Sequence, residues 1–289
     1  MLSNLRRHLL TQPSSIALLE QMRYEAILLP DRTVVETSYV QQGAGEPLIV
    51  LLHGFDSSLL EFRAIVPLLA QQHSVWAIDL LGFGFSKRQP QMAVNPTRIR
   101  QHLYQVWQQI NQPIVLVGAS MGGAVAIDFA LHHPTCVEAV VLIDSVGFSG
   151  SFSGQWLPPA LDELATGWLR WRKQAALTAA TLSSNLLLID AIACSLLHQD
   201  LPYWGDAIAS FTRSGGYTHL SNRIAQLQHP TLILWGTTDD VLGTADAFRF
   251  EQAIAHSQLH WLPCGHVPHL ELPQATVHSI LTFLATIKR

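Results

Sequence analysis

The chain has 289 residues and a formal net charge of −4, and only 13% of its residues are charged. Hydrophobic residues make up 48%, which excludes a disordered chain and is enough to fill the core of a large domain. No run of Lys and Arg is present, so the sequence does not predict a nucleic-acid partner. Cys136, Cys194 and Cys264 are widely spaced, and we interpret them as reduced thiols of a cytoplasmic protein.

Two segments bear on contact with a membrane. Residues 174–189 carry no charge, but polar residues interrupt them and they are too short to span a bilayer, so we predict a buried helix there. Residues 1–23 contain no apolar core of a secretory signal, and we predict an N-terminal amphipathic helix. Four leucines would share one side of that helix: Leu2, Leu5, Leu9 and Leu10.

Short apolar segments alternate with helical patterns along most of the chain. Strands are expected at residues 24–29, 34–40, 48–52, 75–78, 114–117, 137–143, 231–234 and 259–262. Helical spacing of apolar residues covers residues 61–72, 98–110, 121–132, 245–255 and 276–287. This alternation predicts an α/β fold in which helices flank a mostly parallel, eight-stranded sheet.

The alternation stops between residues 148 and 227, where only helical patterns rich in Leu, Ala and Trp occur. Strand and helix patterns resume after this segment. We therefore expect a core formed by residues 24–147 and 228–289, with residues 148–227 inserted after the sixth strand as a helical cap.

The most specific motif is Gly118-Ala119-Ser120-Met121-Gly122-Gly123, between a predicted strand and a predicted helix. A Gly-x-Ser-x-Gly sequence in this context indicates a serine nucleophile on a tight turn, where bulky neighbours would not fit. The following helix would direct free N–H groups towards the reaction centre. In the alternative interpretation, the turn is glycine-rich and Ser120 only caps the helix.

A serine nucleophile requires a base that takes its proton and a carboxylate that orients the base. In this architecture the order along the chain is serine, acid, histidine. We choose His266, which lies in a loop after the last strand, between Gly265 and Pro268; His269 is the alternative.

The carboxylate is expected just after the strand at residues 231–234. We choose Asp239, with Asp240 as the alternative beside it, although both could simply cap the next helix. Asp144, at the end of the strand at residues 137–143, is a further alternative.

The negative oxygen formed during acyl transfer needs two hydrogen-bond donors. We expect the backbone N–H groups of Met121 and Phe55 to form this oxyanion hole, with Gly54 allowing the close approach of the loop. His53, in the same loop, is interpreted as a buried anchor rather than as a second base.

Together these motifs resemble those of the α/β-hydrolase superfamily, over about residues 25–147 and 228–289. The segments that carry the resemblance are His53-Gly54-Phe55, Asp79-Leu80-Leu81-Gly82-Phe83-Gly84-Phe85-Ser86, Gly118 to Gly123, Trp235 to Asp239, and Gly265-His266. The resemblance implies the α/β-hydrolase fold, catalysis by Ser120, Asp239 and His266, and neither a metal nor an organic cofactor.

A narrower resemblance is to the chlorophyll dephytylases of cyanobacteria and chloroplasts, which hydrolyse the phytyl ester of chlorophyll. It is carried by His53-Gly54-Phe55-Asp56-Ser57-Ser58, by Val115 to Ser120, and by Tyr203-Trp204-Gly205-Asp206-Ala207 and Phe211 to Tyr217 at the end of the cap. It implies the phytyl ester of chlorophyll as the substrate. Since the sequence shows no long transit peptide, we expect a cyanobacterial protein, and its low charge and amphipathic N-terminus would suit peripheral contact with the thylakoid membrane.

A long apolar ester would need an apolar cap, and Phe148, Trp168, Phe211 and Tyr217 are the candidate substrate-binding residues. Each could equally belong to the core of the cap. We expect a serine hydrolase of an apolar ester, acting as a monomer or a weak homo-oligomer. The alternatives are a general carboxylesterase, a carbon–carbon bond hydrolase with the same three residues, and a ligand receptor on the same fold.

Overall fold

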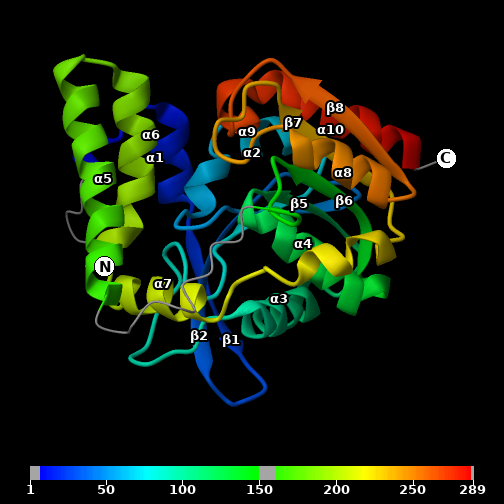
Figure 1. Ribbon diagram of the computed structural model, residues 1–289, viewed down its shortest axis with the longest axis horizontal. Helices are drawn as coiled ribbons and strands as arrows, with labels where there is room; N and C mark the ends of the chain where they lie inside the picture. Colours follow the sequence, from blue (N-terminus) through cyan, green and yellow to red (C-terminus); the bar gives the residue numbers. More distant parts are fainter. Residues whose placement is uncertain (1–6, 150–160, 288–289) are drawn as a thin grey trace.

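A computed structural model describes residues 7–149 and 161–287 of the chain. One eight-stranded sheet has the order β1-β2-β4-β3-β5-β6-β7-β8 (Figure 1). Its strands are β1 Arg23–Leu28, β2 Val34–Gln42, β3 Leu48–Leu52, β4 Val75–Ile78, β5 Ile114–Ala119, β6 Val137–Ile143, β7 Thr231–Gly236 and β8 Ser257–Leu262. The pairs β1–β2 and β2–β4 are antiparallel and the others are parallel, which confirms the predicted sheet.

Helices cover both faces of the sheet, which explains why the central strands are apolar throughout. In β3, Val50 and Leu52 belong to one hydrophobic core, whereas Ile49 and Leu51 belong to the other. The first core also contains side chains of α3 (Pro96–Ile110), α4 (Met121–His132) and α8 (Ala245–Ala253). The second contains side chains of α1 (Pro13–Glu20), α2 (Val66–Leu69) and α10 (Pro273–Ile287).

The parallel strands β3, β5, β6, β7 and β8 all end at the same edge of the sheet. The loops that follow these strands carry the residues that the sequence analysis selected. In parallel α/β sheets this edge is where ligands bind.

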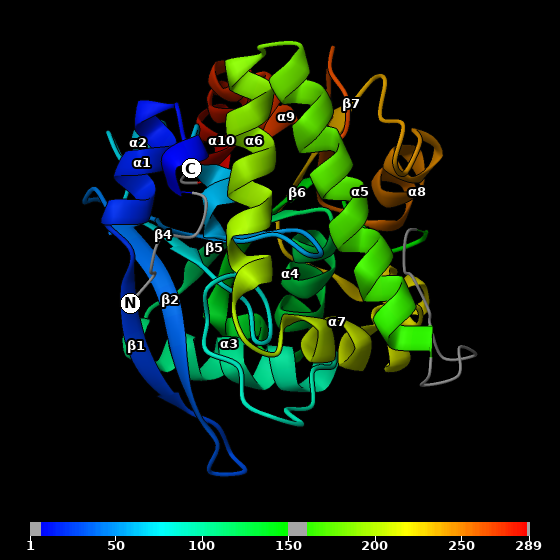
Figure 2. The same ribbon diagram turned by 90° about the vertical axis from the view of Figure 1, so that its left-hand side faces the viewer.

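The helical insertion predicted after β6 is confirmed. Its described helices are α5 (Asp162–Leu182), α6 (Leu186–Leu196) and α7 (Trp204–Arg213). Helices α5 and α6 form a hairpin that stands beside the core, and α7 lies across one end of it (Figures 1 and 2).

The single buried helix predicted at residues 174–189 was wrong. The helix α5 ends at Leu182, the chain turns through Ser184 with a φ of 54°, and Asn185 caps α6 by accepting the N–H of Leu188. The polar residues 183–185 favour this turn, because their side chains compete for backbone hydrogen bonds. The adjoining leucines are exposed rather than buried, by 83% at Leu182 and 67% at Leu187.

The helix predicted at residues 61–72 is also shorter than expected. The structure has a 3-10 turn at Leu59–Phe62 followed by the four-residue α2. Pro67 has no N–H and its ring clashes with the carbonyl four residues earlier, so a helix starting at residue 61 cannot continue through it. The predicted apolar stripe is nevertheless fully buried, from Phe62 to Leu69.

The N-terminal helix is shorter than predicted, because it runs only from Pro13 to Glu20 and Leu9 and Leu10 of the expected leucine stripe precede it. Pro13 is well suited to the first turn of a helix. A 3-10 turn at Arg7–Leu9 precedes it, and Leu10 and Leu18 are buried in the second core. Leu2 and Leu5 lie outside the described residues. Within residues 7–149 and 161–287, no helix has the length and apolar character needed to cross a bilayer.

Candidate active site

Ser120 occupies a sharp turn between β5 and α4. Its φ of 51° and ψ of −116° lie in a region that residues with side chains rarely adopt. The turn is fixed by backbone hydrogen bonds: Ser120 donates its N–H to the Ile143 carbonyl at 2.9 Å and accepts the N–H of Gly123 at 3.0 Å. The side chain therefore stands at the carboxyl edge of the sheet.

The glycines around Ser120 are required by close backbone contacts. A Cβ at Gly122 would lie 1.9 Å from the Leu52 carbonyl oxygen, and a Cβ at Gly118 would lie 2.2 Å from the Gly122 carbonyl oxygen. These contacts press the start of α4 against β3 and β5. The Gly-x-Ser-x-Gly spacing thus has a steric cause in this structure.

Asp239 and His266, predicted from segments far apart in the chain, are in direct contact. The His266 Nδ1 lies 2.9 Å from the Asp239 Oδ2. The other carboxylate oxygen, Oδ1, accepts the backbone N–H groups of Val241 and Leu242 at 2.8 and 3.0 Å. Burial opposes the charge on Asp239, but the hydrogen bonds from His266 and these N–H groups outweigh it and lower its pKa.

The two alternative residues from the same loops lie elsewhere. Asp240 is exposed. His269, in α9 (Pro268–Glu271), is buried with its Nε2 3.1 Å from Glu61 and its ring against Phe62.

Glu271 holds the loop that carries His266. Its carboxylate accepts the N–H of Gly265 at 3.0 Å and the N–H of Val267 at 3.3 Å, one on each side of His266. The backbone of the loop is thereby fixed on both sides of the imidazole.

A cavity of about 470 Å³ opens at this edge, and both Ser120 and His266 line it. Their side chains do not hydrogen-bond to each other in this structure. Such contacts are often long in ligand-free enzymes and shorten when substrate binds.

The loop after β3 passes directly beside Ser120. A Cβ at Gly54 would lie 3.4 Å from the Ser120 Cβ, so this backbone packs directly against the serine. Glu61 accepts the Gly54 N–H at 2.9 Å and thereby fixes the loop. The next residue, Phe55, lines the cavity together with Met121, which is the first residue of α4.

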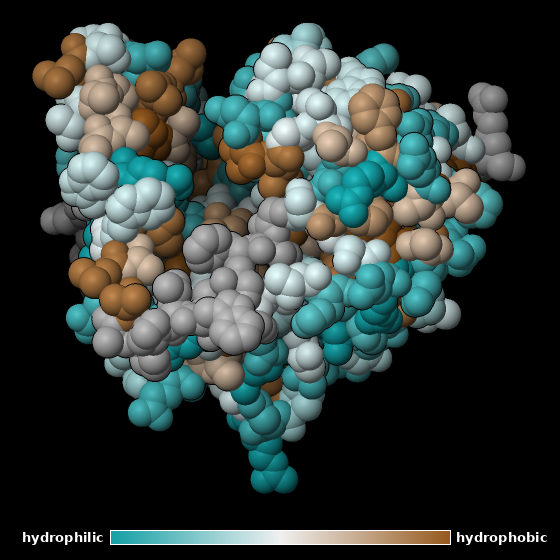
Figure 3. All heavy atoms as spheres, viewed as in Figure 1, coloured by the Kyte–Doolittle hydropathy of each residue, from teal (hydrophilic) through white to brown (hydrophobic). Residues whose placement is uncertain are grey.

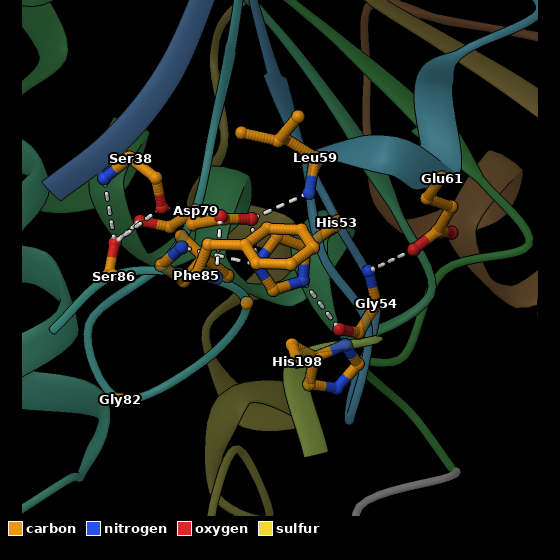
Figure 4. Close-up of polar contacts among 12 residues, drawn as sticks. Ser38, His53, Gly54, Leu59, Glu61, Asp79, Gly82, Phe85, Ser86 and His198 are labelled. Carbon is orange, nitrogen blue, oxygen red and sulfur yellow. Dashed lines mark hydrogen bonds and ion pairs between the residues drawn. The ribbon is translucent and has the colours of Figure 1, made fainter. Parts of the chain in front are cut away.

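His53 anchors this loop, and its surroundings identify its neutral tautomer. The Leu80 N–H donates to the His53 Nε2 at 3.1 Å, so the proton must lie on Nδ1, from which His53 donates to the Gly54 carbonyl at 2.8 Å (Figure 4). His53 is thus a buried structural residue, as predicted.

Asp79, at the end of β4, holds the neighbouring loops together (Figure 4). Its carboxylate accepts the N–H groups of Leu59 and Phe85, at 2.6 and 2.8 Å, and the hydroxyl of Ser38 at 2.5 Å. Complete burial nevertheless raises its pKa. The Asp79–Ser86 segment of the sequence motif therefore supports the site without lining the cavity.

Residues 49–279 match the model of the alpha/beta hydrolase family. The chain belongs to this family.

Two curated relatives and one solved structure illustrate the similarity. The alpha/beta hydrolase domain-containing protein VTE7 of Arabidopsis thaliana is 34% identical over 81% of this chain and 73% of the relative. The 2-hydroxy-6-oxo-6-(2'-aminophenyl)hexa-2,4-dienoic acid hydrolase of Metapseudomonas resinovorans is 28% identical over 87% of this chain and 88% of the relative. The structure of the CarC serine hydrolase of carbazole degradation superposes with a TM-score of 0.73 at 24% identity, covering 92% of this chain and 99% of that one.

In this α/β hydrolase, Asp56 ties the cap to the loop after β3. Its carboxylate lies 2.8 Å from Lys173 Nζ, accepts the side-chain N–H groups of Gln199 and Trp204 at 2.8 Å each, and lies 3.2 Å from His198 Nε2. Burial opposes its charge, but the Lys173 ammonium and the His198 hydrogen bond hold its pKa well below the usual range. Burial lowers the pKa of His198 to about 4, so this histidine is neutral near pH 7.

The sequence analysis missed the role of Asp56, which it included only as part of a motif. The partners lie between 117 and 148 positions further along the chain. No local spacing signals such distant contacts; the only sequence signal was an acidic residue directly after the expected oxyanion donor Phe55.

The four predicted substrate-binding residues divide into two pairs. Phe211 and Tyr217 line the cavity, whereas Phe148 and Trp168 are absent from the described lining. Phe148 packs against Phe250, and Trp168 is 54% exposed beneath the guanidinium of Arg172. The sequence placed all four in the insertion, but it could not show which side of the cap each faces.

Proposed function

We propose that this α/β hydrolase is a serine esterase with Ser120 as nucleophile, His266 as base and Asp239 as orienting acid. The observation that carries the proposal is the Asp239–His266 hydrogen bond, which orients a ring on the wall of the cavity that Ser120 also lines. Asp239 fixes a proton on His266 Nδ1, which leaves Nε2 as the acceptor.

The reaction begins when the Ser120 hydroxyl oxygen attacks the ester carbonyl carbon while His266 Nε2 takes the hydroxyl proton. The carbonyl oxygen becomes negative and accepts hydrogen bonds from the N–H groups of Phe55 and Met121. His266 then donates its proton to the departing alcohol, which leaves an acyl-serine. A water molecule, deprotonated by His266, hydrolyses the acyl-serine and restores Ser120.

The cavity favours an apolar substrate. Apolar side chains from both core and cap line it, among them Val146, Phe211, Tyr217, Leu242 and Leu270. Phe211 and Tyr217 belong to the stretch that resembles the chlorophyll dephytylases. We therefore infer a long-chain ester, with the phytyl ester of chlorophyll as the specific candidate.

A second candidate, hydrolysis of a carbon–carbon bond, is favoured by the similarity to the dienoic acid hydrolase and would use the same three residues. A ligand receptor on this fold would bind without repeated turnover. These functions can be distinguished by whether the protein hydrolyses esters with repeated turnover.

The test measures hydrolysis of p-nitrophenyl esters of increasing chain length by the full protein and by Ser120→Ala. We expect multiple turnovers, faster with longer chains, and a loss of about 10⁴-fold or more in kcat for Ser120→Ala. A single acylation without turnover would favour the receptor, and ester hydrolysis retained by Ser120→Ala would contradict the proposal. Release of phytol and chlorophyllide from chlorophyll then tests the specific substrate, which fails if short esters are cleaved and chlorophyll stays intact.

We also propose that the tip of the α5–α6 hairpin contacts a membrane surface. Leu182, Leu186, Leu187 and Leu188 are exposed there, and no charged residue lies between Lys173 and Asp190. Hydrophobic side chains gather at this end of the hairpin, and a hollow separates the hairpin from the core (Figure 3). An exposed, uncharged leucine cluster is suited to insertion at the lipid interface.

The same face of α6 continues from this tip into the cavity. Leu187, Ala191 and Ser195 are four residues apart and so share one side of the helix, and Ala191 and Ser195 line the cavity. A rise of about 6 Å along the helix separates each from the next. An apolar chain leaving a bilayer would therefore have a short path to Ser120.

Flotation with phosphatidylglycerol vesicles tests the contact. We expect the native protein to float with vesicles and Leu182→Ser/Leu187→Ser to remain behind. Leu28→Ser/Val34→Ser, which alters exposed residues on the distant β1–β2 hairpin, is the matched control. Equal flotation of both double variants would overturn this assignment.

A further inference from the structure

Asp144 is a buried carboxyl group behind the loop that carries Asp239, and the reaction proposed above does not use it. It follows β6 directly, has a φ of 40°, and its side chain is completely buried. Its Oδ1 accepts the Gly236 N–H at 2.9 Å, at the start of the turn that leads to Asp239. Its Oδ2 is buried and has no hydrogen-bond partner among the described residues.

The Asp144 carboxyl group lies close to two other titratable side chains. One carboxyl oxygen of Asp144, one of Asp239 and a ring nitrogen of His266 lie within 4.8 Å of one another. Glu271 and Cys264 are the further titratable groups whose charge acts on Asp144. Two carboxylates at this distance in a buried site cannot both ionise without a large cost.

Asp239 has room for one more hydrogen bond. Each oxygen of an ionised carboxylate can accept two. Its Oδ1 already accepts from Val241 and Leu242, whereas among the described residues only His266 donates to Oδ2. A protonated Asp144 would supply the missing donor and would also satisfy its own buried oxygen.

We propose that Asp144 is a positioning residue that keeps a proton on Oδ2 and donates it as a hydrogen bond to Asp239. Asp239 alone then carries the charge. The hydrogen bond from Asp144 fixes the orientation of the Asp239 carboxylate that holds His266. This arrangement agrees with the opposite directions of the two pKa values: burial raises that of Asp144 to about 9, whereas that of Asp239 is lowered. This proposal rests on the proposed function, since it assumes that Asp239 orients His266 as the base.

The first experiment compares kcat/KM of Asp144→Asn and Asp144→Ala on a p-nitrophenyl ester across pH 6 to 10. Asn keeps an acceptor for Gly236 and an N–H donor for Asp239, so we expect nearly native activity at pH 7. Ala removes both, and we expect a loss of roughly 10- to 100-fold. Above about pH 9 the native enzyme should lose activity as Asp144 ionises, and Asp144→Asn should not.

Combining substitutions of Asp144 and Asp239 shows whether Asp144 acts through Asp239 or contacts His266 directly. If Asp144 acts through Asp239, replacing it by Ala should change kcat/KM little in an Asp239→Ala background. Additive losses, or substantial activity in Asp239→Ala that disappears in the double variant, would mean that Asp144 itself orients His266. Either result overturns the proposal, as does an alkaline decline that persists unchanged in Asp144→Asn.

A stability measurement gives a readout that does not depend on activity. An Asp with a raised pKa in the folded state loses relative stability as pH rises from about 4, its value in unfolded chains, towards about 9. The stability of Asp144→Asn relative to the native protein should therefore increase with pH across this window. A difference independent of pH would show that Asp144 is ionised and would overturn the proposal. If instead Ser120→Ala retained full activity while this difference appeared, the proposed function would fail and the protonation state of Asp144 would stand.

Discussion

The carboxyl edge of the sheet and the α5–α6 hairpin differ in the burial and hydrogen bonding of their side chains. At the edge, polar groups are buried and held by backbone N–H groups, as at Asp239 and Asp79. In the hairpin, α5 has one buried residue, Ala180, and leucines at the turn are exposed. The rigid edge suits chemistry that depends on distances, whereas the exposed hairpin suits contact with an apolar partner.

Asp56 is one of the residues that join the cap to the core. It follows Phe55, the expected oxyanion donor, and binds side chains from α5, α7 and the 3-10 turn after α6. The position of the cap and the shape of the loop after β3 are therefore coupled through this buried carboxylate.

The largest effect is expected from adding a methyl group at the edge. In Gly122→Ala, the new Cβ would lie 1.9 Å from the Leu52 carbonyl oxygen, so β3 and α4 would have to separate. We expect urea unfolding to show a loss of more than about 4 kcal/mol, or no folded protein at all. A stability within about 1 kcal/mol of the native value would show that this contact is not tight.

Breaking the link between the regions should have the next largest effect. Asp56→Asn leaves the Lys173 ammonium without a carboxylate in a largely buried site, and we expect a loss of about 3 to 5 kcal/mol. KM should also rise, because the cap loses its attachment to the loop after β3. The matched control is Lys87→Met, which breaks an exposed ion pair with Glu36 and should cost less than about 1 kcal/mol.

Mildly acidic pH should lower the free energy of unfolding, because buried histidines become protonated when the chain unfolds. Burial lowers the pKa of both His102 and His198 to about 4, whereas unfolded chains bind this proton near pH 6.5. The stability that these neutral histidines contribute is present above pH 6.5 and is lost as pH falls towards 4. We expect a loss of about 2 kcal/mol per histidine between pH 7.5 and 5.

His102→Gln measures that contribution directly. Its unfolding free energy should depend less steeply on pH between 7.5 and 5 than that of the native protein. The exposed His256 provides the control, because His256→Gln should leave the native slope unchanged. An unaltered slope in His102→Gln would contradict the assignment.

The smallest effect is expected in the hairpin and has the opposite sign. A Cβ at Gly167, inside α5, would meet no atom of the described residues within 4 Å. Since alanine favours a helix over glycine, Gly167→Ala should raise stability by up to about 1 kcal/mol. The same type of substitution that disrupts the edge at Gly122 would thus be neutral or stabilising here. Urea unfolding checks this, and a Gly167→Ala variant less stable than the native protein would contradict it.

Most of the fold could be predicted because strands buried on both faces leave an unmistakable apolar pattern. Residues 48–52 and 137–143 have the bounds that the sequence indicated. The failures have local causes: Pro67 interrupts one expected helix, and the polar turn at residues 183–185 divides another. Periodicity indicates which side of a helix is apolar, but it does not say whether another element covers that side.

The contact between Asp239 and His266 could be anticipated because each follows a strand that ends at the same edge. The link from Asp56 to Lys173 could not, because nothing in the sequence states where the cap folds back onto the core. For the same reason Phe211 and Tyr217 could not be separated in advance from Phe148 and Trp168.

The most direct test of the central claim is the site at which a fluorophosphonate reacts, mapped by peptide mass spectrometry. The account predicts one stoichiometric adduct on Ser120, greatly slowed in His266→Gln and absent in Ser120→Ala, with both variants folded. An adduct on another residue, or a folded native protein that does not react, would contradict it.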